Sequence, residues 1–361
     1  MKYVQSTLAK LVVNLALVGL SLAATTAPAQ ADMLLGNTQG NSVSRYNATT
    51  GAYLGDFFAA GAGGLASPDA LTYGADGNLY VSSGSNSSGQ ILRYDGQTGA
   101  FMGVFAQGGG LLRPYGTAFG PDGKLYVASF LTDQILRYDG QTGAFLDVFA
   151  SGNGTQAGLL NGPNGLLFGA NGTLYVTTEG SVADGKGGIS FLFDSQVLRY
   201  NIATGAGQVF AAQPAPTPKG NGYVSLLGLG FGADGLLYTS DYAGGIRSFS
   251  ANGALVQTID TGALFGAGIA TSVGDFAFGA DGALYASVFD DNGNGVSSNG
   301  VARCVIATGA CSAFVTDNAH LARPIGFALT PSVAAVPEPG NWLLMGLGLF
   351  GVFAAAARRR A

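Results

Sequence analysis

The chain has 361 residues, few charges and an excess of glycine. Only 10% of the residues are Asp, Glu, Lys or Arg, 60 are glycine, and the formal net charge is −5 at pH 7. A weakly acidic surface repels phosphate backbones, which excludes a nucleic-acid-binding protein, and a hydrophobic content of 47% excludes a disordered chain.

The N-terminal segment has the layout of a secretory signal peptide. Lys2 and Lys10 flank the start of an apolar run at residues 11–24, and Ala29-Gln30-Ala31 offers a small-x-small cleavage site before Asp32. We therefore expect residues 1–31 to form a helical signal peptide that is removed on export.

Residues 32–335 contain a repeated unit. A hairpin turn recurs at Asp76-Gly77, Asp122-Gly123, Asn171-Gly172, Asp234-Gly235 and Asp281-Gly282, and an arginine recurs at Arg45, Arg93, Arg137, Arg199, Arg247 and Arg303. Each unit holds four short apolar or alternating runs separated by tight turns, the pattern of a propeller blade. A four-stranded meander cannot bury both faces alone, so the blades must stack around an axis. The sequence predicts an all-β, six-bladed β-propeller in which the six arginines bridge neighbouring blades.

The two ends of this segment predict how the ring closes. Three strands stand at its start, at residues 33–36, 42–46 and 53–58, and a single inner-strand pattern stands at its end, at residues 324–329. Three strands and one strand complete a blade, so we expect the C-terminal strand to pair beside the N-terminal three.

The run Gly120-Pro-Asp-Gly-Lys-Leu-Tyr-Val127 resembles the consensus of NHL-repeat and gluconolactonase-like propellers. The resemblance covers the whole segment and implies the fold. It implies no catalytic residue, because the glutamate that supplies the first metal ligand early in gluconolactonase-like domains has no counterpart here.

The two cysteines predict a disulfide. Cys304 takes the place of Tyr94 and Cys311 that of Phe101, and these positions face each other across a hairpin. Export to an oxidising compartment favours a bond between them, and two free buried thiols are the alternative.

A ligand site is expected on the face with the variable connections, near the axis. Four residues there carry side-chain oxygens of the kind that Ca²⁺ prefers: Asp69, Asn164, Glu179 and Asp241. A convergent Ca²⁺ site is one interpretation of this set, and solvated loop polar groups are the other.

The C-terminal residues 336–361 have three parts. We expect Pro337-Glu338-Pro339 to stay extended, the apolar run at residues 342–357 to form a helix, and Arg358-Arg359-Arg360 to hold the end on the cytoplasmic side. This resembles the PEP-CTERM sorting signal of exopolysaccharide-producing Gram-negative bacteria, in which an exosortase-type membrane protease cuts at Pro-Glu-Pro. An ordinary single-span anchor is the alternative, although the run is shorter than a permanent span prefers.

These features predict an exported propeller at the outer surface or in the extracellular matrix of a Gram-negative bacterium, anchored transiently in the inner membrane by its tail. Its expected role is non-enzymatic binding or structure, with an exopolysaccharide or another surface protein as partner. The alternative is a divalent-metal-dependent lactonase or ester hydrolase with its site in the propeller channel.

Overall fold

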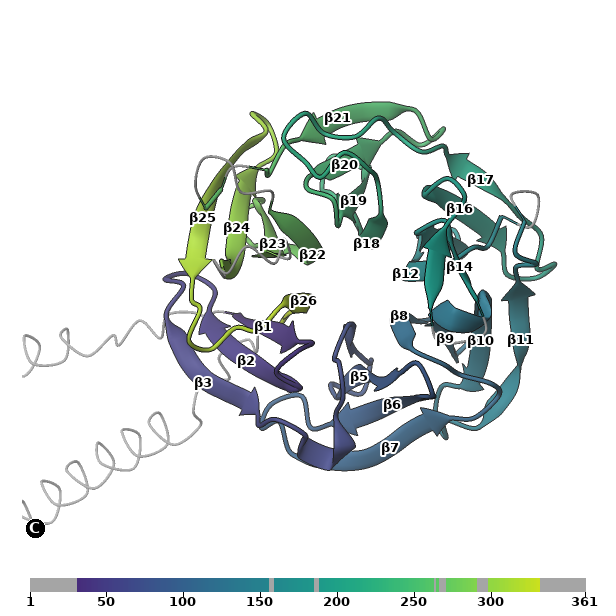
Figure 1. Ribbon diagram of the computed structural model, residues 1–361. Helices are drawn as coiled ribbons and strands as arrows, with labels where there is room; N and C mark the ends of the chain where they lie inside the picture. The colour runs from purple at the N-terminus through teal and green to yellow at the C-terminus, as the bar shows by residue number, and fades with distance from the viewer. Residues whose placement is uncertain are drawn as a thin grey trace, which may run out of the picture. The chain divides into compact units, whose positions relative to one another are not determined.

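The computed structural model describes residues 31–155, 159–184, 188–262, 264–265, 271–290 and 298–331. The compact unit Asp32–Pro331 consists of six four-stranded sheets arranged as a ring, which confirms the predicted propeller (Figure 1). Residues 1–30 of the predicted signal peptide and the predicted C-terminal helix lie outside the described residues. Within the described ranges the only helical elements are two 3₁₀ turns, η1 (Ala62–Gly64) and η2 (Phe130–Thr132), and no helix is long and apolar enough to cross a membrane.

The first three blades run from the innermost strand outward. Blade 1 contains β26 (Pro324–Leu329), β1 (Asp32–Asn37), β2 (Ser42–Asn47) and β3 (Tyr53–Phe58). Blade 2 contains β4 (Leu71–Tyr73), β5 (Leu79–Ser85), β6 (Ser88–Tyr94) and β7 (Phe101–Gln107). Blade 3 contains β8 (Pro114–Phe119), β9 (Lys124–Ser129), β10 (Gln134–Asp139) and β11 (Phe145–Ser151).

The other three blades follow in the same order. Blade 4 contains β12 (Pro163–Phe168), β13 (Thr173–Thr178), β16 (Gln196–Asn201) and β17 (Gly207–Ala211), with an extra hairpin of β14 (Ser181–Ala183) and β15 (Ile189–Phe191). Blade 5 contains β18 (Leu226–Phe231), β19 (Leu237–Asp241), β20 (Ile246–Phe249) and β21 (Leu255–Ile259). Blade 6 contains β22 (Ser272–Phe278), β23 (Leu284–Phe289), β24 (Asn299–Val305) and β25 (Ala310–Thr316).

The repeated Asp-Gly-x-Leu-Tyr pattern shapes the hairpin between the first two strands of a blade. Glycine takes the left-handed conformation that the turn needs, as at Gly123 with φ 76°. The turn aspartate accepts a hydrogen bond from the tyrosine hydroxyl four residues later, in the pairs Tyr80–Asp76, Tyr126–Asp122, Tyr238–Asp234 and Tyr285–Asp281. The turn and the second strand are therefore fixed together.

The second-strand tyrosines also join neighbouring blades. Four of them pack edge to face against a phenylalanine of the next blade's inner strand, in the pairs Tyr80–Phe119, Tyr126–Phe168, Tyr175–Phe231 and Tyr238–Phe278. Their ring centroids lie 4.9–5.6 Å apart, within the range of favourable aromatic pairs. Aromatic contacts therefore join these neighbouring blades, a role that was predicted for the recurrent arginines.

The recurrent arginines contact their own blades, so the prediction that they bridge neighbouring blades was wrong. Arg137 and Asp147 form a bidentate ion pair across the β10–β11 hairpin. Arg303 pairs with Asp281, a turn residue of its own blade. The guanidinium groups also lie over aromatic rings of their own blades, Arg137 over Phe149 and Arg303 over Tyr285.

Arg247 is not equivalent to the other five arginines. Tyr238 pairs with Ser248 in blade 5, whereas in blade 2 the matching Tyr80 pairs with Arg93. Arg247 is therefore displaced by one position along its strand, which places its side chain on the opposite sheet face. It is fully buried there and forms an ion pair with Asp241.

Cys304 and Cys311 are directly opposite each other on β24 and β25 and are joined by a disulfide. Cys304 pairs with Leu284 as Tyr94 pairs with Leu79, so the cysteines occupy the hairpin position that aromatic residues hold in blade 2.

Removing this disulfide should destabilise the last blade moderately. Closing a loop between cysteines 7 residues apart stabilises the fold by about 2–3 kcal/mol, chiefly by restricting the unfolded chain. We expect Cys304→Tyr/Cys311→Phe, which restores the aromatic pair of blade 2, to regain part of the loss seen in Cys304→Ser/Cys311→Ser. Urea denaturation of the three proteins measures this, and equal midpoints for all three would contradict the assignment.

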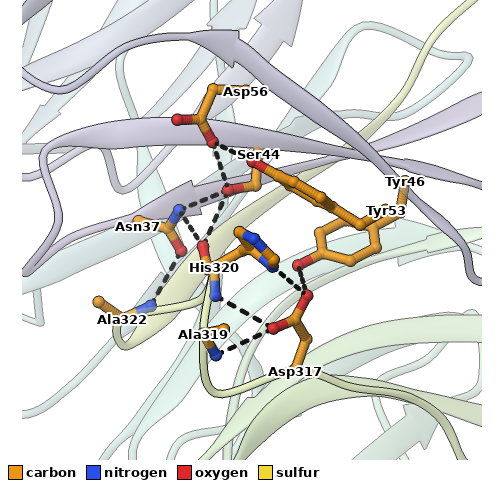
Figure 2. A network of polar contacts seen from close by, with 9 residues as sticks. All are labelled: Asn37, Ser44, Tyr46, Tyr53, Asp56, Asp317, Ala319, His320 and Ala322. Atoms are coloured by element: carbon orange, nitrogen blue, oxygen red, sulfur yellow. Dashed lines mark hydrogen bonds and ion pairs between the residues drawn. The ribbon is translucent and has the colours of Figure 1, made fainter.

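The ring closes as the sequence predicted, because β26 pairs antiparallel with β1. Figure 2 shows the contacts that hold the connection before β26 against blade 1. Asn37 Nδ2 and Ser44 Oγ donate to the His320 carbonyl, and the His320 ring stacks on Tyr53 at a centroid distance of 3.8 Å. Asp317 Oδ2 accepts a hydrogen bond from the Tyr46 hydroxyl at 3.0 Å and lies 2.8 Å from His320 Nδ1. The N- and C-terminal strands are thus tied by side chains as well as by the sheet.

Candidate functional site

A cavity of about 700 Å³ opens at the mouth of the central channel, where the inner strands begin. Its volume lies within the range of small-molecule sites. It is lined by the starts of inner strands, by β15 and by residues 213–225 of the connection from blade 4 to blade 5. The β14–β15 hairpin and this long connection have no counterpart in the described parts of the other blades. They therefore form the cavity wall on one side of the channel mouth.

Three of the four predicted oxygen ligands line this cavity: Asp69, Asn164 and Glu179. Asn164 Nδ2 donates to Glu179 Oε1 at 2.7 Å, and Ser225 Oγ donates to Glu179 Oε2 at 3.0 Å. These hydrogen bonds hold the Glu179 carboxylate in one orientation.

Burial opposes the negative charges in the cavity. It raises the pKa of Glu179, although the hydrogen bonds from Asn164 and Ser225 act to lower it. Burial also raises the pKa of Asp69 to about 7, against the attraction of Arg113 and Arg323. The carboxyl groups of this site therefore bind protons more readily than surface carboxyl groups do.

The fourth predicted ligand, Asp241, does not line the cavity, so its assignment to this group was wrong. Its Oδ1 accepts the backbone N–H groups of Ser225 and Ala243, and its Oδ2 lies 3.0 Å from Arg247 NH2. The Asp241 carboxylate is therefore bound by the buried Arg247 and does not face the cavity.

Two arginines that were not predicted as site residues, Arg113 and Arg323, also line the cavity. Arg113 and Arg323 have left-handed backbone conformations, with φ 47° and 51°, and each precedes a proline. A residue before proline normally adopts an extended backbone, so both positions are strained. The repeated Arg-Pro pair at the start of β8 and of β26 was the signal available in the sequence.

Aromatic rings hold these guanidinium groups. The Arg113 group lies 5.3 Å from the ring centroids of both Tyr115 and Phe130. The Arg323 group lies over Tyr242 and donates to its hydroxyl at 2.8 Å. Cation–π contact and hydrogen bonding therefore place both positive charges before any ligand arrives.

The channel below the cavity contains one further acidic residue, Asp275 on β22. Asp275 occupies the register position held by Gly116 in blade 3 and Gly165 in blade 4. Burial raises its pKa to about 7, opposed by a hydrogen bond from the Phe276 N–H.

The predicted Ca²⁺ site has little support in this geometry. Within the described ranges, no three His, Cys, Asp or Glu side chains come together as a metal site does. Asp69 and Glu179 share the cavity with Arg113 and Arg323, whose charges compete with a cation. We therefore propose no resident metal.

The C-terminal tail lies outside the described residues, but its sequence is decisive. Residues 335–360 match the PEP-CTERM protein-sorting motif. This PEP-CTERM motif implies export, sorting to the surface and processing by an exosortase, which is a membrane protease. No curated protein matches the chain.

Solved structures with the same fold have very different sequences. A chain of the nidogen/laminin complex aligns with a TM-score of 0.57 and 14% identity, over 84% of this chain and 99% of that one. A protein of unknown function from Bacteroides caccae aligns with a TM-score of 0.56 and 12% identity, over 83% and 99%. A Lactobacillus plantarum protein gives 0.54 and 16%, over 84% and 100%. At these identities the likeness concerns the fold alone.

Proposed function

We propose that this protein is a non-enzymatic binding module that is displayed at the cell surface or in the extracellular matrix. The observation that carries the proposal is the PEP-CTERM match at residues 335–360. In this scheme the tail anchors the chain transiently in the inner membrane, the exosortase cuts at Pro337-Glu338-Pro339, and the propeller remains outside.

The propeller supplies the binding element of this scheme. The cavity is walled by loops that differ between blades, and its charged side chains are already oriented by their neighbours. Pre-oriented groups lose little entropy on binding, which favours ligand recognition.

The hydrolase alternative has no specific observation in its favour. It requires a convergent ligand set, and Asp241 is engaged by Arg247 instead. The two arginines beside Asp69 and Glu179 also offset the negative charge that would hold a divalent ion.

Deleting residues 337–361 should move the protein from the surface fraction into the periplasm or medium, with the propeller intact. The reason is that the deletion removes the sorting motif but none of the strands. Cell fractionation and limited proteolysis measure location and folding.

The matched control is Glu338→Ala in the full chain, which alters the Pro-Glu-Pro segment while keeping the apolar run and the arginines. We expect this variant to stay unprocessed in the membrane fraction. An unchanged surface location for the deletion variant would exclude a sorting role for the tail.

A further inference from the structure

The polar side chains of the channel-mouth cavity are unusually mixed in charge. Six of them are planar groups: Asp69, Glu179, Asn164, Gln213, Arg113 and Arg323. The carboxylates only accept hydrogen bonds, the guanidinium groups only donate, and the amides do both. A ligand that satisfies this set must donate and accept at many points.

This mixture disfavours the simpler ligand classes. A phosphate or other compact anion would meet Asp69 and Glu179, and a cation would meet Arg113 and Arg323. A lipid chain would exclude water from these polar groups and offer them no hydrogen bonds, at a cost of about 1–3 kcal/mol for each group left unsatisfied. A neutral, polyhydroxylated ligand has none of these conflicts, since each hydroxyl both donates and accepts.

Geometry favours paired hydroxyl groups. Each planar side chain presents two polar atoms in one plane, as Glu179 does to Asn164 and Ser225. Two neighbouring hydroxyl groups on a sugar ring match such a pair of atoms, as bidentate contacts to guanidinium and carboxylate groups generally do.

Aromatic surface is available beside these groups. Phe191 on β15 lines the cavity and is 58% exposed, and Tyr223 on the opposite connection is 45% exposed. The face of an aromatic ring is negative, so it attracts the weakly positive C–H groups on one side of a sugar ring. The cavity thus lines up exposed aromatic rings for the C–H groups of a saccharide and planar polar side chains for its hydroxyl groups.

We propose that this cavity binds a neutral oligosaccharide, with Glu179 accepting from its hydroxyl groups and Phe191 stacking on a ring. The proposal rests on the proposed function, since it names the ligand of that same module. The strained, stacked arginines are the fixed donors of the site, and the cavity volume suits a drug-sized segment of a glycan chain.

The test is calorimetric titration of the protein purified after export, with neutral tetrasaccharides of glucose, mannose, galactose and N-acetylglucosamine. We expect saturable binding of at least one tetrasaccharide. Glu179→Gln and Phe191→Ala should each weaken it at least about tenfold, because a charge-assisted hydrogen bond or a stacked ring is lost. Glu179→Gln keeps the side-chain shape and can still meet Asn164 and Ser225.

Two control variants lie away from the cavity. Asp95→Asn is matched to Glu179→Gln, because Asn47 and Asn201 make the same turn hydrogen bonds that Asp95 makes. Phe145→Ala on outer strand β11 is matched to Phe191→Ala, with 40% exposure. Both should bind as the wild type does.

Three results would overturn the proposal: no tetrasaccharide saturates, Glu179→Gln binds as tightly as wild type, or a pool of linear peptides binds the cavity instead. The sorting experiment is independent of these outcomes. If the protein binds glycans but its location does not depend on the tail, only the proposed surface role is refuted. If it is sorted by its tail but binds no glycan, only the proposed ligand is refuted.

Discussion

Replacing Arg247 with leucine should destabilise the propeller by about 3–5 kcal/mol, and replacing Asp241 with serine in the same molecule should recover most of that loss. The single change leaves a buried carboxylate without its counter-ion. The double change removes both charges together. Urea denaturation of wild type, both single variants and the double variant measures the coupling.

The other blades supply the replacement residues. The position of Arg247 is held by Leu92 in blade 2 and Leu136 in blade 3, and that of Asp241 by Ser83 and Ser129. The double variant therefore restores side chains that this fold already accommodates.

The buried pair is also imperfectly satisfied. Arg247 Nε and NH1 have no hydrogen-bond partner among the described residues. Burial lowers the pKa of Arg247 and raises that of Asp241, so the interior opposes both charges. Replacing such a pair by well-packed residues is often neutral or stabilising. Since Arg247 NH2 also donates to the Ala215 carbonyl, the pair helps to hold the connection that walls the cavity.

The matched control is the partly exposed pair Arg137–Asp147, whose side chains are 20% and 46% exposed. The same substitutions there should cost less than about 1 kcal/mol, because solvent screens the charges. Additive losses at Arg247 and Asp241, with no recovery in the double variant, would show that the pair does not act as a unit.

The fold could be predicted because its information is repeated. Five recurrent turns and six recurrent arginines predicted the blades, and the unmatched motif at residues 324–329 identified the closing strand to the residue. The failure at Arg247 has a physical cause. Ile-Arg-Ser-Phe in blade 5 resembles Leu-Arg-Tyr in the other blades, but Phe249 is the residue that pairs with Leu237. A shift of one position inverts the sheet face, and composition alone does not reveal such a shift.

The candidate site was only partly predictable for a related reason. Asp69, Asn164 and Glu179 could be placed together because inner strands meet at the axis. Arg113 and Arg323 could not, because their contribution depends on a left-handed backbone that positions them above the channel mouth. Asp241 was misplaced because Arg247 was predicted to be equivalent to the other five arginines, whereas it lies on the opposite sheet face and pairs with Asp241.

Asp275→Asn should stabilise the propeller at pH 8, by up to about 4 kcal/mol, and should have little effect near pH 4. Burial raises the folded-state pKa of Asp275 to about 7, whereas an unfolded aspartate titrates near its ordinary value of about 3.9. Between these values the unfolded chain ionises and the folded chain stays protonated. Stability therefore falls as the pH rises through this window, by about 1.4 kcal/mol per unit, and levels off above pH 7.

The wild-type protein should thus be several kcal/mol less stable at pH 8 than at pH 5, with Asp69 contributing in the same direction. Asp122→Asn is the control of opposite sign. Burial alone would raise its pKa, but hydrogen bonds from Lys124 and Tyr126 lower it, so its stabilisation is present at pH 8 and is lost as the pH falls. Urea denaturation from pH 2 to pH 8 follows all three proteins, because the loss at Asp122 begins only below the ordinary aspartate pKa of about 3.9. A flat wild-type profile, or an Asp275→Asn profile parallel to it, would contradict the prediction. It would mean that the channel solvates this carboxyl group as well as the surface does, because burial is the cause of its raised pKa.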